Sequence, residues 1–166
     1  MKAIYPGTFD PITYGHLNIL EKAARMFDEV ILAVADFTAK QNYFSLAERF
    51  ELCRTASAHI PNVKVLTFSG LVVDFAQAQD CRIMIRGMRA VSDFEYELSL
   101  ALTNIKLRPD IETVFLVPSL RYMYLSSSMI RQLAELGAEL KDFVPPIVAQ
   151  ALKDRTVGES NAEKEY

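Results

Sequence analysis

The sequence predicts a single-domain α/β protein in which a doubly wound parallel sheet of five strands carries helices on both faces. Five short apolar runs alternate with longer segments in which apolar residues recur every three or four positions. The short runs are continuously apolar, as is typical of strands buried on both faces. With 166 residues, of which 51% are apolar, the chain is long enough for one sizeable core.

The five strands are predicted from runs rich in β-branched and other large apolar residues. They are expected at residues 2–5, 29–35, 62–68, 82–87 and 112–118. Helical segments between the strands imply parallel pairing, because a crossover helix lets each new strand run in the same direction as the last.

Helices are predicted from apolar stripes between the strands. The stripes are Leu17, Leu20, Ala24 and Phe27; Leu46, Phe50 and Cys53; and Phe94, Leu98, Ala101 and Ile105. Two further helices are expected at 126–136, stopped by Gly137, and from the prolines at 145–146 to about Arg155. We therefore expect a domain over 1–155 and a polar, frayed tail over 156–166.

Composition and charge limit the classes of function. The net charge of −3 argues against nucleic acid as the main partner. The sequence has neither an 18-residue apolar run nor a leader-peptide pattern, so we expect no membrane association and a cytoplasmic location. Cys53 and Cys81 lie in apolar sequence without a CxxC pair, which predicts reduced core thiols.

The candidate site lies in the loops that follow the strands, because open parallel sheets bind ligands at the carboxyl ends of their strands. These loops are 6–15, 36–44, 69–70, 86–92 and 118–126. The first loop has neither GxGxxG nor the P-loop pattern. It offers Gly7 for close backbone approach, the Thr8 hydroxyl, and His16 at a helix start, where phosphate is favoured. The alternative is that its glycines shape a turn and His16 caps the helix.

Two further stretches favour an anionic ligand. Arg86 and Arg89 follow a buried strand, and a guanidinium group can donate two parallel hydrogen bonds to phosphate oxygens. The alternative is that they form ion pairs with Asp93 or Glu95. Ser126, Ser127 and Ser128 precede a helix, where N-capping alone would explain one of them.

A polyanionic ligand is expected from the convergence of these groups. Lys40 adds a charge from the second loop. Without a ligand, five groups would repel one another or remain unpaired: Lys40, Arg86, Arg89, His16 and Thr8. Glu97, Leu100 and Asn104 share one helix face, which suits a pocket wall. The sequence has no cluster of carboxylates that would predict a metal held by the protein alone. Magnesium is therefore expected to arrive with a nucleotide.

Three stretches together resemble the bacterial phosphopantetheine adenylyltransferases of the nucleotidyltransferase superfamily. They are "GTFDPITYGH", "IRGMRAVSDFEYE" and "SSSMIR", and the resemblance runs from residue 3 to about residue 152. It implies a Rossmann-like fold and reversible transfer of AMP from ATP to 4'-phosphopantetheine, which gives dephospho-CoA and pyrophosphate by direct in-line displacement. It also implies Mg²⁺ with ATP, a homohexamer, and CoA as a feedback ligand.

The resemblance also implies roles for individual residues. His16, Thr8, Lys40 and Arg86 would be catalytic. The ATP-binding positions would be Gly7, Thr8, Phe9, His16, Gly87, Met88, Arg89, Glu97, Tyr122, Met123, Tyr124, Leu125, Ser126, Ser127 and Ser128. The acceptor would contact Thr8, Lys40, Leu71, Val72, Arg86, Tyr96, Leu100 and Asn104.

The chain departs from the family pattern at a few positions. Gln41 and Asn42 stand where many relatives have lysine and proline, and Leu120, Arg121 and Met123 replace more usual polar or acidic residues. A cytidylyltransferase or another adenylyltransferase shares the first motif. A nucleotide-sensing module is the alternative from a different class, because a fold alone does not prove chemistry.

Overall fold

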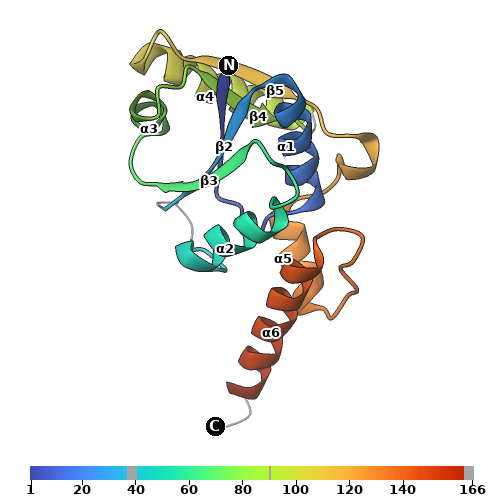
Figure 1. Ribbon diagram of the computed structural model, residues 1–166. Helices are drawn as coiled ribbons and strands as arrows, with labels where there is room; N and C mark the ends of the chain where they lie inside the picture. The colour runs from blue at the N-terminus through green and yellow to red at the C-terminus, as the bar shows by residue number, and fades with distance from the viewer. Residues whose placement is uncertain (37–40, 90, 163–166) are drawn as a thin grey trace.

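The computed structural model describes residues 1–36, 41–89 and 91–162, and the side chains of these residues except 91–92 and 158–162. Within this part of the chain, five parallel strands form one sheet in the order β3-β2-β1-β4-β5 (Figure 1). The doubly wound α/β architecture expected from the sequence is therefore confirmed.

The strands are β1 (Lys2–Gly7), β2 (Glu29–Ala35), β3 (Val63–Phe68), β4 (Ile83–Gly87) and β5 (Glu112–Leu116). Continuous burial was expected for all five, and this was wrong for the edge strands β3 and β5, where exposed and half-buried residues predominate. An edge strand has one neighbour and its ends lie at the rim of the helical layers, so its side chains are less covered.

One face of the sheet packs against α1 (Tyr14–Met26) and α2 (Leu46–Ala56). The same apolar cluster continues into α5 (Ser127–Glu135) and α6 (Pro146–Ala162). Helix α5 ends just before Gly137, whose φ of +73° is the left-handed conformation expected of a helix stop. Cys53 belongs to this cluster, and both cysteines are buried free thiols.

The other face packs against α3 (Val72–Ala78) and is bordered by α4 (Val91–Leu107). Helix α3 was not predicted, because seven residues are too few to display a helical stripe. The apolar stripe of α4 was expected to be buried, and this prediction was wrong except at Ala101. Phe94, Leu98 and Ile105 are exposed, whereas Glu97 turns inward and is only 8% exposed.

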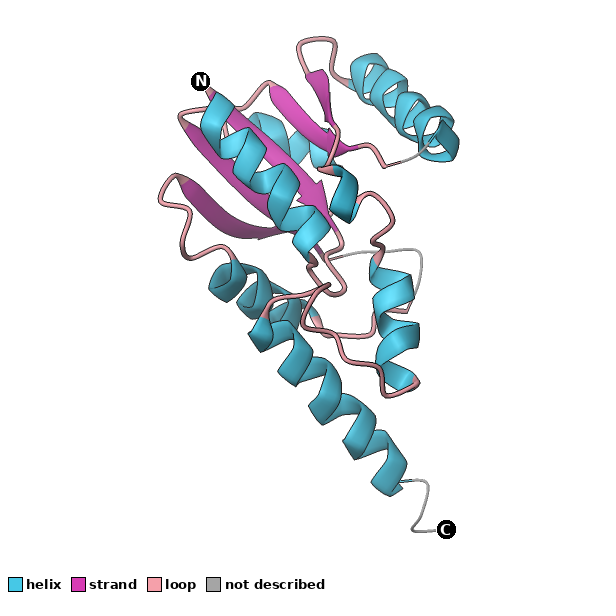
Figure 2. Cartoon of the chain, turned by 90° about the vertical axis from the view of Figure 1, so that its right-hand side faces the viewer, coloured by secondary structure: helices cyan, strands magenta, loops and turns pink. Residues whose placement is uncertain are grey.

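Helix α6 extends away from the sheet to the C-terminal end of the chain (Figures 1 and 2). Its expected end near Arg155 was wrong, since the helix continues to Ala162. The helix packs against α2 and α5 near its start, so its first turns belong to the body of the protein.

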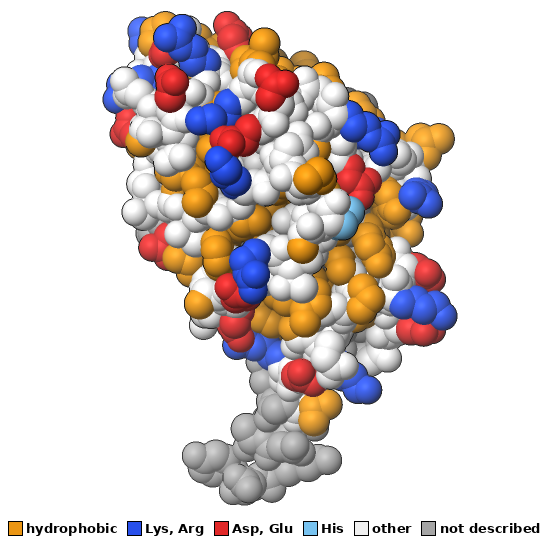
Figure 3. All heavy atoms as spheres, viewed as in Figure 1, with side chains coloured by type: hydrophobic (Ala, Val, Ile, Leu, Met, Phe, Trp, Pro, Cys, Tyr) orange, Lys and Arg blue, Asp and Glu red, His pale blue; other side chains and the backbone are white. Residues whose placement is uncertain are grey.

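The sheet order reverses between β1 and β4. The helix after β1 lies on one face and the helix after β4 borders the other, so the loops after these neighbouring strands diverge. This is the point at which doubly wound sheets leave room for a ligand. On the face seen in Figure 3, acidic and basic side chains are interspersed. None of the described helices is long and apolar enough to cross a membrane.

Candidate active site

A cleft of about 580 Å³ opens at the carboxyl ends of β1 and β4. It brings together residues from four of the loops that the sequence analysis selected. The expected site residues in its lining are Gly7, Thr8, Phe9, His16, Arg86, Gly87, Arg89, Tyr96, Glu97, Leu125, Ser126, Ser127 and Ser128.

Other expected residues do not line this cleft. Leu71 and Val72 begin α3, and Leu100 and Asn104 lie on α4, where Asn104 donates a hydrogen bond to Sδ of Met84 at 3.4 Å. Met88 and Tyr124 lie next to lining residues in the sequence but are not part of the lining, and neither are Tyr122 and Met123. Lys40 is outside the described residues.

Several lining residues were not predicted as site residues. They are Tyr5, Pro6, Asp10, Thr13, Gly15, Ile19, Gln41, Asn42, Pro118 and Arg131. Most lie inside or directly beside the motifs, so adjacency in the sequence could have suggested them. Arg131 ends the "SSSMIR" stretch, but its hydrogen bond to the backbone oxygen of Asp10 at 2.6 Å joins segments far apart in the chain and could not be predicted from the sequence.

His16 is held by the cap of α1. Thr13 is the N-cap, and its hydroxyl accepts a hydrogen bond from the backbone N–H of His16 at 3.4 Å. In return, the backbone N–H of Thr13 donates to Nδ1 of His16 at 3.1 Å. Because Nδ1 accepts, the neutral ring carries its proton on Nε2.

The charge state of His16 follows from its surroundings. Burial, followed by the charges of Arg89 and Arg86, lowers the pKa of His16 from 6.5 to about 4. The ring is therefore neutral at physiological pH. It acts as a fixed hydrogen-bond donor, because its proton is held on the one nitrogen that the cap leaves available.

Phe9 supports the His16 ring. The two rings meet edge to face, with centroids 5.2 Å apart and an interplanar angle of 82°. Phe9 is 3% exposed and has a φ of +49°. Its ring also lies over Gly7, where a Cβ atom would come within 2.8 Å of Phe9 Cζ. Gly7 is therefore required by close contact within the first loop.

Arg86 forms a bidentate pair with Glu97. Its Nε and Nη2 donate to the two carboxylate oxygens at 2.6 and 2.7 Å, and Nη1 donates to the Pro6 carbonyl at 3.0 Å. The paired carboxylate raises the pKa of Arg86 against the opposing effect of burial. The partner is neither Asp93 nor Glu95, the two that the sequence analysis considered.

Arg89 is also partnered. It donates to the carbonyl of Leu125 at 2.7 Å, and its Nε lies 3.4 Å from the Asp93 carboxylate. The argument that these arginines would repel or remain unpaired without a ligand was therefore wrong. The cleft still presents two guanidinium groups, but each is preorganised by protein contacts.

The three serines lie where α5 begins. Ser126 is the N-cap, and its hydroxyl accepts from the Met129 N–H at 3.2 Å. Ser127 donates to the Pro11 carbonyl at 2.8 Å, which ties this loop to the first motif. The first amides of α5 and the serine hydroxyls thus border the cleft, an arrangement that suits an anion.

No group of three or more possible metal ligands occurs among the histidine, cysteine, aspartate and glutamate side chains that the structure describes. Within the cleft, Glu97 is paired with Arg86 and Asp10 accepts the backbone N–H groups of Tyr43 and Phe44. These donors do not fit a metal cage made by the protein alone.

Known proteins are similar to this chain in sequence and in fold. A family model described as cytidylyltransferase-like matches residues 4–133. The phosphopantetheine adenylyltransferase of Dictyoglomus turgidum is 51% identical over 93% of this chain and 97% of its own length. That of Nitrosomonas eutropha is 48% identical over 98% of this chain and 99% of its own.

A solved structure from Vibrio parahaemolyticus supports the fold alone. It is provisionally named a nicotinate-nucleotide adenylyltransferase and is 16% identical to this chain, with a TM-score of 0.71. The superposition covers 93% of both chains, so the similarity extends over the whole domain.

Proposed function

The chain belongs to the phosphopantetheine adenylyltransferase family, and on that premise we propose how its cleft transfers an adenylyl group from ATP to 4'-phosphopantetheine. An oxygen of the acceptor phosphate attacks the α-phosphorus of ATP. The new oxygen–phosphorus bond forms as the bond to the β-phosphate bridge breaks, which leaves dephospho-CoA and pyrophosphate. The reverse reaction follows the same path.

The observation that carries this proposal is the neutral His16 donor beside two arginines at the β1/β4 switch point. The acceptor phosphate is already ionised, so the reaction needs no general base. It needs the two substrates in line and donors directed at charge that develops on the α-phosphate. His16, with its proton on Nε2, is suited to stabilise that charge, and the Thr8 hydroxyl is its proposed partner.

The remaining roles divide the cleft between the two substrates. Arg89, Gly87 and the serines at the start of α5 are assigned to ATP, because free helix amides and a guanidinium favour its phosphates. Arg86 is assigned to the acceptor phosphate, together with Lys40. Glu97 holds Arg86 in place, and we propose that it borders the nucleotide through that pair.

Magnesium is proposed to enter as part of the ATP complex. The described side chains offer no cage for it, so the phosphates of ATP would supply most of its ligands. When bound, the ion would neutralise phosphate charge, and the chain's contribution is to orient the phosphates with Arg89 and the α5 amides.

Three finer features are proposed with the function. A homohexamer is supported by the apolar side chains that α4 leaves exposed, among them Phe94 at 42%, Tyr96 at 66% and Leu102 at 58%. CoA is proposed as a feedback ligand, because it contains the product's adenylyl and pantetheine groups. A cytoplasmic location agrees with the two free thiols.

Pyrophosphate release by the purified chain tests the function. We expect release from ATP and Mg²⁺ only when 4'-phosphopantetheine is present. Release with CTP at least as fast as with ATP would favour a cytidylyltransferase. ATP binding without release in the presence of the acceptor would favour a nucleotide-sensing module.

A further inference from the structure

Among the described residues, Arg49 is the largest side chain that is completely buried, with 1% exposure. It lies in the first turn of α2, on the side that faces the sheet. A guanidinium cannot lose a proton in a protein, so its burial is costly unless its donors are satisfied. An apolar residue would fill this core position at lower cost, which suggests that Arg49 has a positional role.

The hydrogen bonds of Arg49 join three separate segments. Nη1 donates to the carbonyl oxygen of Thr8 at 2.8 Å and to that of Ala35 at 2.7 Å. Nε donates to the carbonyl oxygen of Phe44 at 3.1 Å. One planar group therefore fixes the first motif, the end of β2 and the residue that leads into α2.

The charge of Arg49 has no carboxylate partner among the described residues. Asp10, also buried, bonds instead to the backbone N–H groups of Tyr43 and Phe44 at 2.6 and 2.8 Å. Phe44 is thus held through its N–H by Asp10 and through its carbonyl by Arg49. The charged groups of Arg49 and Asp10 therefore form these hydrogen bonds with backbone atoms, not with each other.

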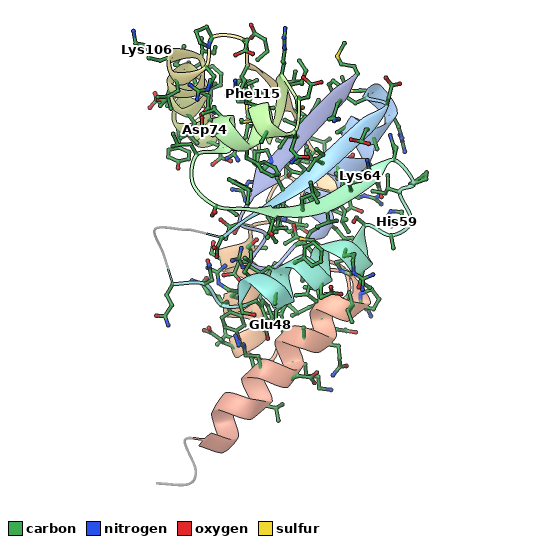
Figure 4. The ribbon with its side chains drawn as sticks, turned by 60° about the vertical axis from the view of Figure 1, so that its left-hand side comes forward. Glu48, His59, Lys64, Asp74, Lys106 and Phe115 are labelled. Atoms are coloured by element: carbon green, nitrogen blue, oxygen red, sulfur yellow. The ribbon has the colours of Figure 1, made fainter. Side chains whose placement is uncertain are left out.

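A third charged residue holds the same segment from outside. Arg155 of α6 donates to the carbonyl of Tyr43, and its guanidinium lies 5.2 Å from the Phe44 ring centroid. Glu48, seen on α2 beside α6 in Figure 4, lies 3.9 Å from Arg155. Gln41 and Asn42, which directly precede this anchored pair, line the cleft.

We propose that Arg49 is a positioning residue for the acceptor, an inference that rests on the proposed function. Arg49 itself is not part of the cleft lining. Its hydrogen bonds link Thr8, which lines the cleft, to Phe44, which ends the segment 41–44. Gln41 and Asn42 of this segment also line the cleft, and the segment directly follows Lys40, which is assigned to the acceptor phosphate. The serines and Arg89, assigned to ATP, receive no hydrogen bond from Arg49. Loss of the three Arg49 hydrogen bonds should therefore weaken binding of the acceptor more than binding of ATP.

Arg49→Lys and Arg49→Met test this proposal, with Arg54→Lys and Arg54→Met as matched controls on the same helix. Arg54 is exposed, and its ion-pair partner among the described residues is Glu51. Lysine keeps the charge but cannot bond three carbonyls in one plane. We expect Arg49→Lys to raise KM for 4'-phosphopantetheine about ten- to a hundredfold, with the Kd for ATP within about twofold. Both Arg54 variants should match the wild type.

Hydrogen exchange provides a second readout that does not depend on turnover. In Arg49→Lys, the amides of Tyr43 and Phe44 should exchange at least about tenfold faster, while those of β4 keep their rates. This measurement also covers the case in which Arg49→Met fails to fold. A wild-type KM in Arg49→Lys, or equal weakening of ATP and the acceptor, would overturn the proposal.

Failure of the proposed function is distinguishable from failure of this inference. A wild-type chain without acceptor-dependent pyrophosphate release would remove the function and the acceptor role of Arg49 together. An active wild type whose Arg49→Lys variant shows no selective change would remove only the role of Arg49.

Discussion

The backbone N–H of Thr13 donates a hydrogen bond to Nδ1 of His16, while the Thr13 hydroxyl accepts one from the His16 N–H. This reciprocal cap is usually made by a carboxylate or amide at the third helical position. Here an imidazole makes it, and the cap that stabilises α1 therefore also decides which ring nitrogen carries the proton. The start of α1 and the proposed catalytic donor are therefore built from the same two residues.

Replacing His16 by alanine should lower turnover about a hundred- to a thousandfold, the usual effect of removing one preorganised donor. KM for either substrate should change much less, because the donor acts on charge that develops during the reaction. Pyrophosphate release at saturating substrates measures the effect. His59→Ala is the matched control, since His59 is exposed and pairs with Glu21. Unchanged turnover in a folded His16→Ala protein would remove His16 from the mechanism.

The stability of the protein should fall in acid partly because of His16. Its pKa is 6.5 in the unfolded chain and about 4 in the folded one, so between these values only the unfolded chain binds the proton. The free energy of unfolding must then decrease as pH falls through this window, by at most about 3.4 kcal/mol, since each pKa unit corresponds to about 1.4 kcal/mol. Urea denaturation of wild type and His16→Gln at pH 7.5 and pH 4.5 measures the difference.

The variant should lose less stability than the wild type over that interval, because glutamine does not titrate. Carboxylates that titrate in the same range are common to both proteins and cancel in the comparison. Parallel pH profiles would show that His16 has the same pKa in both states.

Gly7→Ala should destabilise the protein and slow the reaction together. The new methyl group would lie 2.8 Å from Phe9 Cζ, and Phe9 cannot move without disturbing the His16 ring that it supports. We expect a loss of about 1–3 kcal/mol in the free energy of unfolding, measured by thermal denaturation.

Gly15→Ala is the control for stability. Its methyl group would meet nothing closer than the Thr13 hydroxyl at 3.4 Å, and alanine favours a helix. It should therefore be neutral or slightly stabilising. If Gly7→Ala were as stable as the control, the close contact with Phe9 would not constrain the loop.

The sequence predicted the fold well where the signal was local. Apolar runs located all five strands, and the rule for carboxyl ends led to four loops that meet in the cleft. The prediction failed where a residue's environment depends on a distant partner. Glu97 turns inward on α4 because Arg86 receives it. Arg49 is buried because carbonyls from three segments converge on it, and no sequence pattern near residue 49 indicates this.

Arg86→Lys should weaken the acceptor selectively. Lysine keeps a positive charge but cannot donate paired hydrogen bonds to Glu97 and to a phosphate at the same time. We expect the Kd for 4'-phosphopantetheine to rise about tenfold or more, with the Kd for ATP within about threefold, as measured by isothermal titration. Arg89→Lys should show the opposite preference, since Arg89 bonds to the carbonyl of Leu125 beside the serines. Equal weakening of both ligands by Arg86→Lys would contradict the assignment.

The pair formed by Arg86 and Glu97 should be strongly coupled in stability. The side chains are 25% and 10% exposed, so removing either partner leaves the other charge poorly solvated. Arg86→Leu and Glu97→Leu should each lower the free energy of unfolding by about 3 kcal/mol, measured by urea denaturation. The double variant should recover most of that loss, because it leaves no unpaired charge.

The two single variants and the double variant form a double-mutant cycle, and the same cycle on Arg54 and Glu51 provides a reference for its coupling energy. That pair has a similar 2.7 Å contact, but its side chains are 61% and 55% exposed, so water already solvates both charges. Its coupling should stay below about 1 kcal/mol. If the coupling of Arg86 to Glu97 were equally small, Glu97 would not be needed to hold the guanidinium. Its inward position on α4 would then have to follow from contact with the nucleotide.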